Sequence, residues 1–324
     1  MPSLLERCWY RPHFHILSLL LLPLSWLFLC GVGIRHCLYR CGIKTTYRFS
    51  VPVIVVGNIS VGGTGKTPFV IWLAKLLRAQ GWQPGIVSHG IGGHVHTRPR
   101  KVYAQDEVAV VGDEALLLVR HTGCPLVVCK DRVAAVRALL ADSTSCDVVI
   151  SDDGLQHYAL GRDIEVAIVD GERRFGNGWL LPAGPLREPL SRLQRVDKVI
   201  VNGSADMLLQ SYPWAAVQEG ISAGMSPLPG TTIHAVAAIG NPGRFFAYLR
   251  KQGFTIIEHI FPDHYLYQAA DLNFTDSLPI VMTEKDAVKC ARFADARFWY
   301  VPVEAIVADE VRAYLLNLLS VRRA

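Results

Sequence analysis

One eight-residue stretch, residues 60–67, constrains the fold of this chain more than any other. It reads Ser60-Val61-Gly62-Gly63-Thr64-Gly65-Lys66-Thr67. An apolar run at 53–56 precedes it and an amphipathic pattern at 69–80 follows it, which predicts a strand, a glycine-rich turn and a helix. Backbone N–H groups in such a turn, together with the start of the helix, can surround a polyphosphate. Lys66 is then expected to reach the β- and γ-phosphates, and Thr67 to bind Mg²⁺.

Ser60 stands where the generic phosphate-binding motif has its first glycine, and the other positions of the motif are met. The alternative is a glycine-rich turn that binds nothing. Such a turn has no need of Gly-Lys-Thr at a strand-to-helix junction, so the sequence predicts a nucleotide site at residues 60–67.

The net charge of the chain belongs to its N-terminal segment. The first 50 residues hold six of the 33 basic side chains and one of the 28 acidic ones, so the remaining 274 residues balance at 27 of each. A general nucleic-acid binder needs a basic face on its folded body, so no nucleic-acid partner is expected. Eight dispersed cysteines without a C-x-x-C pair indicate a reducing compartment and no zinc site. No obligate protein partner is indicated.

Residues 14–34 form an uncharged run of 21 residues interrupted by Pro23. As a helix the run would be about 30 Å long, close to the hydrocarbon thickness of a bilayer, with a kink at the proline. A cleaved signal peptide and a buried core helix are alternatives. We favour membrane association, by a span or by a helix lying in the interface. The basic residues that follow (Arg35, Arg40, Lys44 and Arg48) would keep the body cytoplasmic and attract anionic headgroups.

After residue 50, apolar strand-like runs alternate with helical patterns, which predicts an α/β fold with a mostly parallel sheet and helices on both faces. The stretch 203–230, rich in small residues and proline, is expected to be a linker. The expected organisation is a membrane-associating segment at 1–45, a phosphate-binding kinase-type domain at 46–229 and a smaller α/β domain at 230–324.

Two adjacent carboxylates end a strand-like run at 148–150. Asp152 and Asp153 would lie at the carboxyl edge of the sheet, where α/β proteins bind ligands, and either could hold Mg²⁺. A plain Asp-Gly turn is the alternative. Gln156 and His157 on the same loop are candidate substrate contacts.

Five further residues are candidates with strong structural alternatives. Asp113 and Glu114 begin a predicted helix, where acids also serve as ordinary caps. Arg187, in the glycine- and proline-rich loop 175–189, could pair with phosphate, and Asn177 lies in the same loop. His264 follows a strand and could orient or activate a base. Thr283-Glu284-Lys285-Asp286 is interpreted as a helix cap.

These strings occur together in one known family. The loop Gly57–Pro68, then Gly112-Asp113-Glu114, Asp152–Tyr158, Gly176-Asn177-Gly178, Leu181–Glu188, Asp263-His264 and Val281–Cys290 resemble tetraacyldisaccharide 4′-kinase, the lipid A 4′-kinase of Gram-negative bacteria. That family also has Ser or Thr at the position of Ser60. The resemblance covers nearly the whole chain, including the apolar N-terminus.

The resemblance implies a kinase that transfers the γ-phosphate of ATP to the 4′-hydroxyl of a tetraacyldisaccharide 1-phosphate. The reaction belongs to lipid A biosynthesis and takes place at the cytoplasmic face of the bacterial inner membrane. It implies that Asp113 is the general base and that His264 assists it. Combined with the motifs above, Lys66, Thr67 and Mg²⁺ hold the phosphates, with Asp152 and Asp153 beside the metal.

One motif departs from the family. The family has Ser-Arg-Gly-Tyr-Gly-Gly where this chain has Ser88-His89-Gly90-Ile91-Gly92-Gly93. Because His89 replaces a permanently charged guanidinium, we expect a weaker anion contact there, and neither His89 nor Ile91 is included in the site. A GTPase-type switch is disfavoured because Asn-Lys-x-Asp is lacking; a nucleotide-binding scaffold without catalysis is a further alternative.

Overall fold

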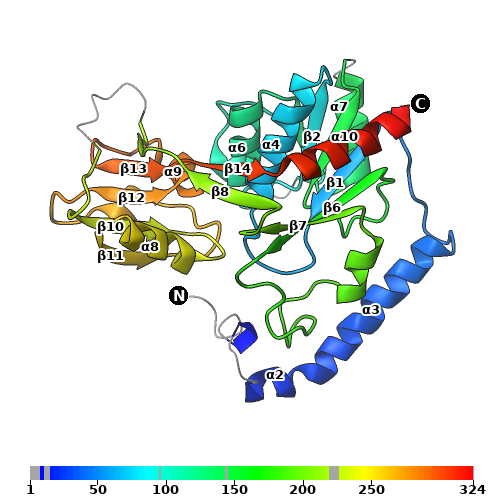
Figure 1. Cartoon of the computed structure of the whole chain (residues 1–324), viewed down its shortest axis with the longest axis horizontal. Coiled ribbons are helices and arrows are strands. Elements are labelled where there is room, and N and C mark those ends of the chain that lie inside the picture. The colour runs from blue at the N-terminus through cyan, green and yellow to red at the C-terminus, as the bar shows by residue number, and fades with distance from the viewer. Residues whose placement is uncertain (1–7, 11–14, 95, 143–144, 219–225, 324) are drawn as a thin grey trace.

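A computed structural model describes residues 8–10, 15–94, 96–142, 145–218 and 226–323. It contains a nine-stranded sheet and a five-stranded sheet that lie side by side (Figure 1). The mostly parallel, doubly covered sheet predicted from the sequence is confirmed.

The large sheet has the order β14-β8-β7-β6-β1-β5-β2-β4-β3. At its centre β1 (Val53–Gly57) runs parallel to β5 (Val148–Asp152) and β6 (Ile164–Asp170). The outer strands are β2 (Pro84–Ser88), β4 (Leu126–Val128), β3 (Arg100–Val102), β7 (Lys198–Asn202), β8 (Met207–Ser211) and β14 (Val303–Val307). Every residue of β1, β2, β5 and β6 is buried, which explains their continuous apolar runs.

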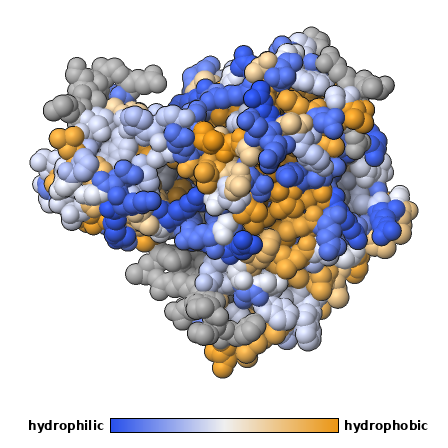
Figure 2. Space-filling view, in the orientation of Figure 1, coloured by the Kyte–Doolittle hydropathy of each residue, from blue (hydrophilic) through white to orange (hydrophobic). Residues whose placement is uncertain are grey.

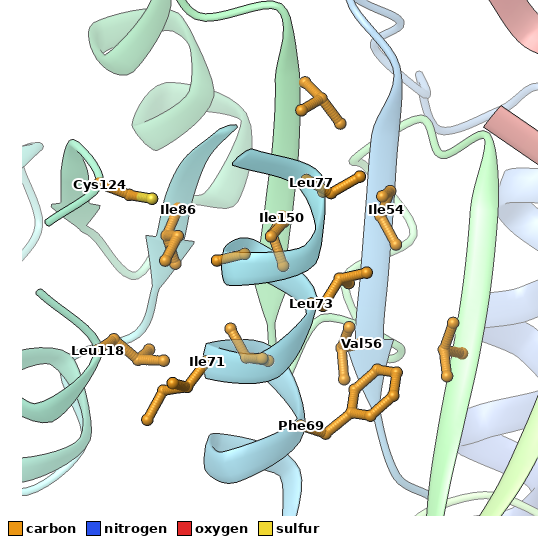
Figure 3. Packing of buried hydrophobic residues seen from close by; sticks show 14 of the residues in the cluster. Ile54, Val56, Phe69, Ile71, Leu73, Leu77, Ile86, Leu118, Cys124 and Ile150 are labelled. Atoms are coloured by element: carbon orange, nitrogen blue, oxygen red, sulfur yellow. The ribbon is translucent and has the colours of Figure 1, made fainter. Parts of the chain in front are cut away.

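Helices cover both faces of the large sheet. On one face lie α4 (Lys66–Ala79), α6 (Asp113–Thr122), which follows the short α5 (Val108–Val111), and α10 (Asp309–Arg323); on the other lies α7 (Arg132–Asp142). Figure 3 shows how α4 packs on the sheet, with Phe69, Leu73 and Leu77 directed at Ile54 and Val56 of β1. This packing fixes the start of α4, and therefore the loop before it, at the carboxyl edge of β1.

The second sheet has the order β11-β10-β12-β13-β9. Its strands are β9 (Ala215–Ala216), β10 (Thr232–Ala237), β11 (Thr255–Ile260), β12 (Ile280–Thr283) and β13 (Phe298–Val301). The helices α8 (Pro242–Lys251) and α9 (Glu284–Cys290) pack on opposite faces of this sheet. Two 3₁₀ helices lie at Leu190–Arg195, between β6 and β7, and at Ala269–Leu272, between β11 and β12.

The expected boundaries at 229 and 324 differ from the structure. The second sheet begins with β9 at 215 and ends with β13 at 301, whereas β14 and α10 return to the large sheet. Only Pro302 separates β13 from β14, and at this residue the chain passes from the second sheet to the large sheet. The stretch 203–230, expected to be a linker, contains β8 and β9.

The N-terminal segment forms two helices, α2 (Ile16–Leu20) and α3 (Leu22–Arg40), that run along the outside of the body (Figure 1). Residues 1–7 and 11–14 of the expected segment lie outside the described part. Pro23 lies in the first turn of α3, where a missing N–H costs nothing, so the expected kink inside one long helix is wrong. Among the described residues, α3 is the one helix long and apolar enough to cross a membrane, by length and composition only.

Only 6% of the apolar window of α3 is buried, so it is not a core helix. Its exposed side chains include Trp26 and Leu27, and Figure 2 shows hydrophobic residues along the lower right of the molecule, where α3 lies in Figure 1. The buried positions of α2 and α3 are instead Ser18 and Ser25. The helices therefore face the body with their polar residues and the surroundings with their apolar ones.

Candidate active site

The predicted phosphate loop connects β1 to α4. Gly62 and Gly65 have φ of +108° and +91°, a region that favours glycine, and Gly65 is the residue before the first turn of α4. The buried side chains of Asn58 and Asn202 donate to the Thr64 hydroxyl (3.4 Å) and the Thr64 carbonyl (3.2 Å). The loop is thus held by a residue that directly follows β1 and by the last residue of β7.

The two carboxylates at the end of β5 have different surroundings. Asp153 accepts two hydrogen bonds from Arg187 (3.0 and 3.1 Å) and lies 3.5 Å from Lys66 Nζ. Burial alone would raise the pKa of Asp153, but Lys66 and Arg187 lower it overall. Burial, with Glu114 and Asp153 nearby, raises the pKa of Asp152 to about 7.

One carboxylate oxygen of Asp152 receives no hydrogen bond from the described residues. Its Oδ2 accepts from Ser88 Oγ at 3.2 Å, whereas its Oδ1 is buried and has no hydrogen-bond partner among the described residues. A buried carboxylate oxygen without a donor is well suited to a cation, and carboxylate and hydroxyl oxygens are the ligands that Mg²⁺ prefers. The donor set Thr67, Asp152 and Asp153 fits Mg²⁺.

Asp113 and His264, 151 positions apart, are in direct contact. Nδ1 of His264 lies 2.9 and 3.1 Å from the two carboxylate oxygens of Asp113, and because a carboxylate only accepts, Nδ1 donates. His264 has φ of +60°, uncommon for a residue other than glycine. A Cβ on Gly92 would lie 3.0 Å from His264 Nδ1 and 3.2 Å from Asp113 Oδ1, so a glycine is needed against the pair.

The Asp113 carboxylate is buried, with its side chain 1% exposed. Burial by itself would raise the pKa of Asp113, but His264, Lys285 and Lys289 lower it overall. Burial would likewise lower the pKa of His264, but the hydrogen bond to Asp113 raises it overall. Each partner therefore stabilises the charged form of the other.

A cleft of about 520 Å³ joins these groups. Its lining includes all of residues 60–67, and Asp153, Arg187, Glu114 and His264. Apolar side chains from both sheets and their helices line the rest: Ile71, Leu117, Leu209, Phe245, Tyr248, Val301 and Val303. The phosphate loop, Asp153, Glu114 and His264 thus share one cavity. Asp113 and Asp152 are not among its lining residues, and Asp113 is joined to it through its hydrogen bond with His264.

Three predicted substrate contacts are not part of this lining. Gln156 donates to the Asn58 carbonyl (3.0 Å) and to Glu188 (3.4 Å). Asn177 donates to the Ala183 carbonyl and accepts from the Trp179 N–H, within its own loop. Burial lowers the pKa of His157 to about 3, so the ring is neutral near pH 7. Gln156 and Asn177 brace the loops around the site.

The sequence interpretation missed three cationic residues that join the two sheets. Lys285 lies 3.2 Å from Glu114, 3.4 Å from Asp263 and 3.3 Å from His264 Nε2. Its string was interpreted as a helix cap, and the Thr283 side chain does accept from the Asp286 N–H. Lys289 lies 3.6 Å from Asp113 Oδ2. Arg173 donates to the Gly240 carbonyl (2.7 Å) and the Asn241 side chain (2.9 Å). Ile91, left out of the predicted site, lines the cleft.

Comparison with known proteins decides the family. The family model described as tetraacyldisaccharide-1-P 4′-kinase, LpxK, matches residues 17–320. The chain belongs to the tetraacyldisaccharide-1-P 4′-kinase family. It is 52% identical to tetraacyldisaccharide 4′-kinase of Nitrosococcus oceani (98% of this chain, 95% of the relative) and 48% identical to that of Methylobacillus flagellatus (98% and 97%).

A solved member of the family has the same fold. The structure of LpxK from Aquifex aeolicus in complex with ATP superposes with a TM-score of 0.74 at 26% sequence identity, over 94% of this chain and 99% of that one. The resemblance inferred from the motifs is confirmed, and with it the assignment of this chain to a family of kinases.

Proposed function

We propose that this kinase transfers the γ-phosphate of ATP to the 4′-hydroxyl of a tetraacyldisaccharide 1-phosphate, in lipid A biosynthesis. One observation carries the proposal: the phosphate loop and the Asp113–His264 pair meet in one cleft. A loop that holds a triphosphate and a pair that accepts a proton are the two parts that phosphoryl transfer to an alcohol requires.

Separate groups of residues bind the phosphates, hold the metal ion and accept the proton. The N–H groups of residues 60–67 and the Lys66 ammonium hold the phosphates, and Arg187 fixes Asp153 beside them. Mg²⁺, held by Thr67, Asp152 and Asp153, would neutralise charge on the phosphates. Asp113 accepts the proton of the sugar hydroxyl, and His264, which lines the cleft in front of it, orients the carboxylate and shares the proton, so the pair titrates as a unit.

The apolar part of the cleft suits the adenine ring. Phe245 and Tyr248 of α8 face Leu209 and Val303 of the large sheet across this part of the cavity, and ligand sites combine apolar walls with a few placed polar groups. Both sheets would then contact one nucleotide.

We infer that α3 lies in the interface of the cytoplasmic face of the inner membrane. Ser25, near its start, accepts from the Ala183 N–H and donates to the Leu180 carbonyl, and Arg35, about 15 Å further along, donates to the Gln156 carbonyl at 2.6 Å. A helix bonded to the body at both places can place its exposed apolar side in lipid without spanning it. The acceptor's acyl chains would occupy the same lipid layer.

The test incubates purified enzyme with γ-labelled ATP, Mg²⁺ and the tetraacyldisaccharide 1-phosphate in detergent. We expect label in the lipid, abolished by chelation of Mg²⁺ and restored when Mg²⁺ is added back. ATP hydrolysis without labelled lipid would contradict the kinase proposal and favour a nucleotide-driven switch. Neither hydrolysis nor labelled lipid would indicate a scaffold without catalysis.

A further inference from the structure

Lys289, on α9, is a buried cation that reaches the Asp113 carboxylate from the other sheet. Its side chain is 1% exposed, and its Nζ lies 2.8 Å from Asp286 Oδ1 and 3.6 Å from Asp113 Oδ2. Burying an ammonium group is costly unless it is paired. Its position between two buried carboxylates therefore calls for a reason.

The ion pair with Asp286 Oδ1 accounts for one of these two carboxylates and leaves the approach to Asp113 to be explained. Oδ2 of Asp286 already accepts from the Ala238 N–H (3.1 Å) and the Thr283 hydroxyl (2.7 Å), bonds that tie α9 to its own sheet. Lys289 instead places its charge where α9 meets α6. Lys289 is not among the residues that line the cleft, so it is not placed to touch substrate.

The proposal rests on the role of Asp113 as base given above. We propose that Lys289 is a positioning residue for phosphoryl transfer: its ammonium group keeps the buried Asp113 carboxylate ionised and seated against His264. A base buried this deeply is useful only if it stays deprotonated before the sugar hydroxyl arrives.

The charges around Asp113 come from three elements. On α6 Glu114 is adjacent; on the loop after β11 are His264 and Asp263; on α9 are Lys285, Asp286 and Lys289, with the Tyr267 ring 5.3 Å from Lys289 Nζ. Lys285, at 3.9 Å from Asp113, is shared with Glu114 and Asp263 and lines the cleft. Among the described residues Lys289 is paired with Asp286 and Asp113 and is absent from the lining of the cleft, so its removal takes a charge away from Asp113 without changing that lining.

The experiment measures kcat against pH, from pH 3.5 to 9 at saturating ATP, for the full chain and its variants, because the pKa of Asp113 is lowered from its ordinary value of 3.8. Removing a cation within about 4 Å of a carboxylate raises the pKa of that carboxylate by about 1–3 units. In Lys289→Met we therefore expect the acid limb of the profile to move upward by about 1–3 pH units. Lys289→Arg keeps the charge and should restore the wild-type limb.

Two further variants separate this role from structural support. Lys289→Met with Asp286→Asn leaves no unpaired buried carboxylate on α9 and supplies the measurement if the single variant does not fold. Lys101→Met removes an exposed lysine of β3 that is paired with Asp142, and should leave the profile unchanged. In an Asp113→Asn background, Lys289→Met should change kcat by less than about twofold, because residues that act as a unit are not additive.

A folded Lys289→Met variant, or its double variant with Asp286→Asn, with an unmoved acid limb would overturn the proposal. So would a Lys289→Met effect as large in the Asp113→Asn background as in the wild type. Failure of the proposed function looks different, because the wild-type enzyme would then put no label into the lipid. An Asp113→Asn variant that retains wild-type kcat would instead refute the base assignment and this proposal together.

Discussion

The exposed apolar side of α2 and α3 gives a quantitative prediction for membrane binding. Leu20 and Leu27 are 71% and 69% exposed in the structure. Replacing both with serine should weaken binding to phospholipid vesicles without destabilising the fold, because neither side chain contributes to the core.

The size of the effect follows from the exposed area. Burying a whole leucine side chain contributes roughly 1.5–3 kcal/mol, so transfer of the exposed 70% into lipid contributes about 1–2 kcal/mol per residue. The double substitution should thus lose roughly 2–4 kcal/mol, a decrease of about 30- to 700-fold in the partition coefficient.

Co-sedimentation with vesicles measures the partition coefficient, and the labelled-ATP assay measures activity on acceptor in vesicles and in detergent. We expect both binding and vesicle activity to fall while detergent activity is kept. Leu228→Ser is the control, because Leu228 is 64% exposed but precedes β10 in the second sheet. Unchanged vesicle binding by the double variant, with thermal unfolding like the wild type, would refute the interfacial placement of these helices.

Three further predictions concern the cleft. Gly92→Ala should lower kcat by about 10- to 100-fold by displacing the catalytic pair, whereas Gly81→Ala, with the same φ of +83° and open space around it, should not; equal losses would mean that backbone strain alone is responsible. Lys66→Met should lower kcat/KM for ATP by about 100-fold or more, while Lys75→Met on the exposed side of α4 should keep the wild-type kcat/KM. A Lys66→Met variant with wild-type kcat/KM would show that Lys66 does not hold the phosphates. His264 has a pKa raised from its ordinary value of 6.5, so its stabilising effect is complete below about pH 6.5 and is lost as the pH rises through the raised value. The difference in Tm between wild type and His264→Asn should narrow between pH 6 and pH 9. A difference that widens over this range would contradict a raised pKa for His264.

The local part of the fold could be predicted from the sequence because it depends on neighbours in the chain. The run at 53–56, the glycine-rich turn and the pattern at 69–80 became β1, the loop and α4 with small shifts of their ends. The return of β14 and α10 to the large sheet could not be predicted, since it depends on pairing between residues 303–307 and 207–211. A single proline between two strands does not reveal which sheet the second strand joins.

The candidate site likewise has a part that the sequence predicts and a part that it does not. Residues 60–67 and 152–153 carry motifs whose chemistry can be recognised, and the structure places residues 60–67 and Asp153 in the lining of one cleft. Lys285 and Lys289 lie on a short helix whose first turn has an ordinary capping sequence. Their role comes from the contact between α9 and α6, which is formed by elements about 170 positions apart. No spacing within the chain encodes such a contact.

The arrangement of cations explains why three neighbouring carboxylates behave differently. Asp153 has Lys66 and Arg187 from its own sheet, and Asp113 has Lys285 and Lys289 from the other, so the pKa of each is lowered. Asp152 has no comparable ion pair among the described residues, and its pKa is raised. Two carboxylates therefore have protein partners that favour their ionised form, and the third is balanced by a proton or by a cation from solution. Because Asp152 lies directly beside Asp153 and the phosphate loop, the site that lacks positive charge is the one where the triphosphate needs Mg²⁺.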